Sequence, residues 1–91
     1  MRYFDWDEGK NQKLKDERDI GFEDVVIAID EGRLLVILDH PKRINQKIYI
    51  INIEGYAYMV PFVEDSEKLF LKTIYPSRKM TKKYIIRKKK V

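Results

Sequence analysis

Apolar residues follow a helical period in the early part of the chain. Apolar residues recur at three- and four-residue spacing from Phe22, which predicts an amphipathic helix over residues 22–31 that ends at Gly32. Residues 8–18 are nearly all polar around Leu14, so we expect a surface helix that Asp7 caps. Aromatic and polar residues alternate over residues 2–6, which predicts a short first strand.

After Gly32 the pattern becomes typical of strands. Apolar runs at residues 34–38, 47–53, 56–63 and 68–75 are separated by turn residues, which predicts four strands in an antiparallel meander. Pro61 lies in the third run and has no N–H, so we expect that strand to lie at a sheet edge or to be bulged. A last helix is expected to begin near Arg78. This order indicates an α+β domain with its helices on one face of the sheet.

Length and composition restrict the classes of protein and of site that the chain can represent. The chain has 91 residues, enough for one domain over residues 1–91, and we expect residues 88–91 to be a frayed basic tail. It has no cysteine and one histidine, which excludes disulfides, thiolate metal sites and a multi-histidine metal site within one chain. No apolar run is long enough for a membrane helix, and the first residues do not suit a secretory signal. We therefore expect a cytoplasmic protein that needs no cofactor.

Charge is distributed unevenly along the chain. Residues 1–31 hold ten acidic and five basic residues, whereas residues 68–91 hold ten basic residues and no acidic one. Such a basic segment predicts binding of a polyanion through one face, the alternative being a solvated helix face that keeps the protein soluble. The acidic residues of the two predicted helices are typical of a solvated face rather than of paired catalytic carboxylates. These are Asp16, Glu17, Glu23 and Asp24.

Two segments carry a resemblance to a known family. At the start of the chain the matching residues are Phe4, Trp6, Asp7, Lys10, Phe22 and Glu23. Near its end they are Ser77, Arg78 and Thr81. These residues, at this spacing, resemble BrnT-type toxins, the ribonuclease members of bacterial toxin–antitoxin pairs. The resemblance implies a RelE-like α+β fold, and an antitoxin with a DNA-binding domain as partner.

The chain departs from the family pattern at two places. Glu17, Arg18 and Asp19 stand where the family often has Lys-His-Gly, and Tyr84 stands where it often has Glu. These departures leave two hypotheses open. One is a metal-independent endoribonuclease that cleaves RNA through attack by the 2′-hydroxyl group. The other is a non-catalytic basic module that binds nucleic acid or an acidic protein.

Three residues are candidates for catalysis. Arg78 follows the last strand, where a guanidinium can hold two phosphate oxygens and stabilise transition-state charge; the alternative is a surface arginine paired with a carboxylate. His40 or Tyr75 could move protons. His40 could equally be a turn residue that bonds to Asp39.

A further set is expected to hold the RNA strand through its phosphates or, for the tyrosine, by base stacking. These residues are Lys47, Lys79, Lys82, Lys83 and Tyr84. Plain solvation explains the lysines equally well. Exposed strand edges also favour a homodimer.

Overall fold

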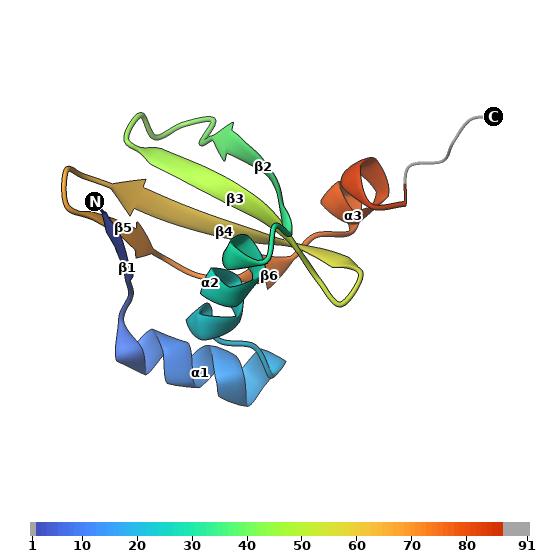
Figure 1. Cartoon of the computed structure of the whole chain (residues 1–91), viewed down its shortest axis with the longest axis horizontal. Coiled ribbons are helices and arrows are strands. Elements are labelled where there is room, and N and C mark those ends of the chain that lie inside the picture. Colours follow the sequence, from blue (N-terminus) through green and yellow to red (C-terminus); the bar gives the residue numbers. More distant parts are fainter. Residues whose placement is uncertain (1, 87–91) are drawn as a thin grey trace.

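The computed structural model of the chain describes residues 2–86 and has the expected α+β architecture (Figure 1). The elements in chain order are β1 (Tyr3–Asp5), α1 (Glu8–Arg18), α2 (Phe22–Asp30), β2 (Leu34–Asp39), β3 (Gln46–Ile53), β4 (Tyr56–Glu64), β5 (Lys68–Leu71), β6 (Tyr75–Pro76) and α3 (Arg78–Tyr84). No helix within residues 2–86 has the length and apolar composition that crossing a membrane requires. The expected frayed tail at residues 88–91 lies outside the described residues.

The sheet contains the predicted meander and one additional parallel pair. Its strand order is β1-β5-β4-β3-β2, and β2 to β5 are joined by antiparallel pairs as expected. β1 runs parallel to β5, so the sheet is mixed. The last predicted strand is in fact two strands, β5 and β6, because residues 72–74 leave the ladder and β6 then pairs with a different part of β4.

The prediction for Pro61 was wrong. β4 is a central strand, and its register with β3 continues through Pro61 and Ile48 without a bulge. The Pro61 carbonyl accepts a hydrogen bond from the Lys72 N–H at 2.8 Å, which places its backbone on the side of β5 and β6. A strand residue directs its N–H and C=O to the same side. Proline thus lacks its N–H on the side of β4 where the ladder is interrupted between β5 and β6. No strand residue there needs that N–H as a hydrogen-bond donor.

The helices lie on both faces of the sheet, which corrects the expectation of one helical face. Side chains of a strand alternate between faces. On β3, Tyr49 and Ile51 belong to the main core with α1 and α2, whereas Ile48 and Ile50 belong to a second cluster that includes residues of α3. Figure 1 shows α1 and α2 together below the sheet and α3 apart from them.

Local turn chemistry agrees with the sequence analysis. Gly32 follows α2 with a φ of 80°, as expected of the residue that ends a helix. Glu54 and Gly55 form the predicted tight turn between β3 and β4, with φ values of 54° and 85°. Positive φ at both central residues is the mark of the two-residue hairpin turn that matches strand twist. The Glu54–Gly55 turn sets the register between β3 and β4.

Candidate functional site

The basic helix α3 is fixed to β4 by a small set of backbone and hydroxyl contacts. The Ser77 N–H donates to the Ala57 carbonyl at 3.0 Å, and the Ser77 hydroxyl caps the helix by accepting from the Met80 N–H at 3.1 Å. The buried Thr81 hydroxyl accepts from the Ala57 N–H and donates to the Ser77 carbonyl, both at 2.8 Å. The start and the middle of this short helix thus have a fixed position on the sheet.

One side of α3 is apolar and the other is cationic. Met80, Tyr84 and the following Ile85 pack against the second apolar cluster. The exposed side chains of the helix are those of Arg78, Lys79, Lys82 and Lys83. We call these four residues the α3 cations. None of them forms an ion pair with a carboxylate within residues 2–86, so the alternative of a paired surface arginine at Arg78 has no support there.

The two candidate tyrosines differ in their surroundings. Tyr75 lies in β6 opposite Met59 and is half-buried, three residues before Arg78. Tyr84 is half-buried in the second apolar cluster, and the Lys83 ammonium lies 5.5 Å from the centre of its ring. Tyr84 therefore packs against the sheet and holds a lysine beside it by a cation–π contact. This packing leaves little of its ring for base stacking.

His40 and Lys47 lie at the opposite end of the sheet from α3. Lys47 is paired across the ladder with Asp39, the residue before His40. Lys47 is five residues along β3 from Asn52, the partner of Ala57, which corresponds to about 17 Å of strand. The predicted catalytic group of Arg78, Tyr75 and His40 is thus not brought together, because the antiparallel hairpin directs the loop of His40 away from α3.

Both of these residues already have local partners. The His40 Nδ1 atom accepts from the N–H groups of Lys42 and Arg43 at 3.1 and 3.2 Å, so His40 is a turn residue with those partners rather than Asp39. The Lys47 ammonium lies 3.6 Å from the Glu64 carboxylate. These contacts explain both side chains without a phosphate.

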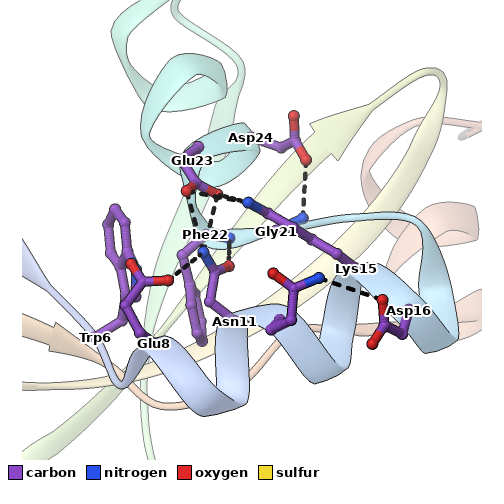
Figure 2. Close-up of polar contacts among 10 residues, drawn as sticks. Trp6, Glu8, Asn11, Lys15, Asp16, Gly21, Phe22, Glu23 and Asp24 are labelled. Carbon is purple, nitrogen blue, oxygen red and sulfur yellow. Dashed lines mark hydrogen bonds and ion pairs between the residues drawn. The ribbon is translucent and has the colours of Figure 1, made fainter.

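A buried polar network between α1 and α2 was missed by the sequence analysis (Figure 2). Asn11 is fully buried, and its carbonyl oxygen accepts from the Phe22 N–H at 2.7 Å while its amide donates to both Glu23 carboxylate oxygens at 3.1 Å. Lys15 also lies 3.2 Å from Glu23. The Asn11 amide, followed by the backbone and Lys15, lowers the pKa of Glu23. Glu23 is thus a structural carboxylate.

Three further acidic residues of the N-terminal segment also have structural contacts. Asp7 caps α1 by accepting from the Lys10 N–H, as predicted, and Asp24 accepts from the Gly21 N–H at the start of α2. Asp16 accepts from the Gln12 amide on the surface. The Asn11 network can be recognised only in the three-dimensional structure, because Asn11 and Phe22 are eleven residues apart in the sequence. No constellation of acid and base for catalysis is built by these groups.

The described residues contain no group of three or more histidine and carboxylate side chains that could hold a metal ion. The α3 cations are the best-defined candidate site because they are exposed on a helix that is fixed to β4. No protein-family model matches the chain, and no curated protein or solved structure matches it either. The likeness to BrnT-type toxins stays a prediction from the residues named above.

Proposed function

We propose that the protein binds nucleic acid, with RNA as the expected ligand, through the α3 cations. The observation that carries this proposal is the exposure of four cations on one fixed helix with no carboxylate partner within residues 2–86. Lysine and arginine side chains bind phosphate groups and release condensed counterions, which supplies affinity without sequence preference. The contacts of Thr81 and Ser77 hold the helix in place, so its cations can meet a strand without prior ordering.

Other cations of the chain support this choice by contrast. Lys15, Arg33, Lys47 and Lys68 each have a carboxylate within 4.0 Å. Their charge is already partly compensated, and a surface ion pair competes with a phosphate for the same ammonium or guanidinium. Cations elsewhere in the described chain, such as Lys13, Lys42 and Lys72, also have no ion pair. α3 differs from them because it gathers four such cations on one short helix that contains no acidic residue.

A ribonuclease is the second candidate. It is favoured by the position of Tyr75 and Arg78 on either side of the Ser77 cap, at the same end of the sheet. In that function Arg78 would stabilise the charge on the phosphate oxygens, and Tyr75 would move a proton. His40 lies too far along the sheet to join them. An antitoxin with a DNA-binding domain, which the resemblance implies, would cover the α3 cations with an acidic segment.

The experiment compares two double variants with the same change of charge. Lys79→Gln/Lys82→Gln removes two α3 cations, whereas Lys13→Gln/Lys42→Gln removes two exposed lysines from α1 and the β2–β3 loop. Binding of a labelled single-stranded RNA is measured for both variants and for the wild type. We expect the α3 variant to weaken binding at least about tenfold, and the matched control to change it less than about twofold. Equal losses in both variants would contradict a site on α3.

A second assay, with the wild type and one further variant, separates binding from cleavage. Labelled RNA is incubated in chelator with the wild type and with Arg78→Ala, and the products are resolved on a denaturing gel. Discrete products from the wild type alone would establish the ribonuclease. Intact RNA in both, with binding retained by the wild type, would favour the binding module.

A further inference from the structure

One edge of the sheet lacks most of the features that usually keep a strand edge from pairing, since its only irregularity lies at its first residues. β2 bonds only to β3 and forms an edge of the sheet (Figure 1). It has six residues, Leu-Leu-Val-Ile-Leu-Asp, with no lysine or proline among them. The opposite edge, β1, has only three residues. Proteins commonly protect an edge by short length, lysine or proline, and a long apolar edge invites another strand.

The free side of β2 presents backbone groups as well as apolar side chains. The His40 N–H donates to the Gln46 carbonyl of β3 at 3.0 Å, which directs the backbone of His40 towards β3. Because backbone direction alternates in an antiparallel ladder, the N–H and C=O groups of Ile37 and Asp39 point away from the sheet. A register irregularity lies between Leu34 and Val36, and the strand is regular beyond it.

Exposed apolar side chains gather at the same edge. The Ile37 residue is 48% exposed although it lies in the middle of a strand, and Ile44 in the adjoining loop is 95% exposed. Exposed isoleucines next to unpaired backbone groups are typical of a surface that a partner covers. This surface therefore has the features of a sheet edge that accepts an additional strand.

The charges at the two ends of β2 select the partner. Arg33 precedes the apolar run and Asp39 ends it. Two copies of this strand running antiparallel would bring the Arg33 end of each to the Asp39 end of the other, whereas a parallel pair would place like charges together. Asp39 is exposed and takes part in no ion pair within residues 2–86. Arg33 uses its guanidinium for Asn52 and Glu31, which leaves further N–H donors.

We propose that two copies of the chain pair antiparallel through β2 and form one continuous sheet across a two-fold axis. The interface is isologous, because each copy contributes the same strand with its complementary ends. α3 is fixed to β4 at Ala57, and its apolar side shares the second cluster with residues of β2, whereas its four cations lie on the exposed side of the helix. The inference goes beyond the proposed function and does not depend on it.

Two isoleucines offer a matched pair of variants. Ile37 on β2 and Ile27 on α2 are 48% and 49% exposed, so replacing either with lysine removes similar exposed apolar surface. Sedimentation velocity is measured from about 1 μM to about 300 μM protein, since dimerisation depends on concentration. We expect the wild type to reach twice its chain mass of 11.0 kDa. Ile37→Lys should raise the dimer Kd at least about tenfold, and Ile27→Lys should leave it unchanged within about twofold.

Circular dichroism checks that each variant is folded. Should Ile37→Lys fail to fold, Asp39→Lys at the exposed end of the strand replaces it, because it places a lysine opposite Arg33 of the second copy. This variant should also weaken the dimer at least about tenfold. A wild type that stays at the chain mass at every concentration overturns the proposal. So does equal dissociation of the β2 and α2 variants, which would place the interface elsewhere.

Discussion

Asn11 joins the two N-terminal helices through a carboxamide that is fully buried. Its oxygen satisfies the Phe22 N–H, one of the backbone donors left free at the start of α2, while its nitrogen donates to Glu23. Gly21, which begins α2, has no side chain with which to satisfy these donors. A side chain of one helix therefore serves as the cap of the next, and the angle between the helices depends on it.

Replacement of Asn11 should be costly. In Asn11→Ala the Phe22 N–H loses its partner in a dry environment, so we expect the free energy of unfolding to fall by about 2–3 kcal/mol. Urea unfolding measures the loss. The matched control is Gln12→Ala, on the exposed side of the same helix, which should change stability by no more than about 0.5 kcal/mol. A loss in Asn11→Ala as small as that of the control would show that the network does not support α2.

Glu23 should make stability depend on pH in the acidic range. Hydrogen bonds from Asn11 lower its pKa from the ordinary value of 4.5, so the folded state prefers the carboxylate. Its contribution is present above pH 4.5 and is lost as the pH falls through the lower folded pKa. The side chain is 47% exposed, so we expect the contribution to be at most about 1 kcal/mol. The stability difference between wild type and Glu23→Gln, measured by urea unfolding, should shrink on acidification; a constant difference would contradict the assignment.

For individual residues, the sequence predicted mainly contacts between groups that are close together in the chain. Asp7 was predicted as a cap, and its N–H partner lies three residues ahead. Ser77 was not named as a cap, although its partner has the same spacing. Asn11 was not recognisable, since its partners belong to another helix and a polar residue on a polar helix carries no signal of burial. His40 is an exception to this rule. Its partners, the Lys42 and Arg43 N–H groups, are local in the chain, but they are backbone groups that no residue type specifies.

Among the elements, α3 shows how a short helix is made rigid by the sheet beneath it. It has seven residues, too few to be stable by itself, and its position depends on the bonds of Ser77 and Thr81 to Ala57. The sequence predicted a last helix that begins near Arg78, as the structure has it. It did not reveal which face of the sheet it covers, because both faces of β3 are apolar and either could receive it.

Substitution of Thr81 tests whether its hydroxyl group holds α3 on β4. Thr81→Val keeps the shape but removes the acceptor for the buried Ala57 N–H, so stability should fall by about 1–3 kcal/mol. Thr81→Ser keeps the hydroxyl and should lose less. Hydrogen exchange at the Ala57 amide should accelerate in the valine variant relative to the serine variant. Equal exchange rates in the two variants would show that this bond does not hold α3.

Pro61 illustrates a prediction that failed at the same scale. Proline in a strand ordinarily indicates an edge, since the ladder loses a donor. Here β4 tolerates Pro61 because the ladder on that side is interrupted between β5 and β6, which were predicted as one continuous strand. The break itself follows from pairing with two separate parts of β4, a long-range feature that the local pattern of residues 68–75 does not encode.

For the whole molecule, the separation of charge seen in the sequence persists in three dimensions. Several acidic side chains of α1 and α2 take part in a cap or in the Asn11 network, and these helices pack on the opposite face of the sheet from α3. Composition predicted the existence of a basic surface, but the arrangement of a site around Arg78 needed the sheet topology. The topology separates His40 and Lys47 from the α3 cations, so the proposed binding site consists of residues of that helix.

The salt dependence of RNA binding tests this account most directly. The slope of log Kd against log salt concentration counts the cations that displace counterions from the strand, at about 0.7 per contact for single-stranded nucleic acid. We predict that Lys79→Gln/Lys82→Gln lowers the slope by about 1.4, whereas Lys13→Gln/Lys42→Gln leaves it unchanged. A slope that is the same for the wild type and the α3 variant would contradict phosphate binding by α3.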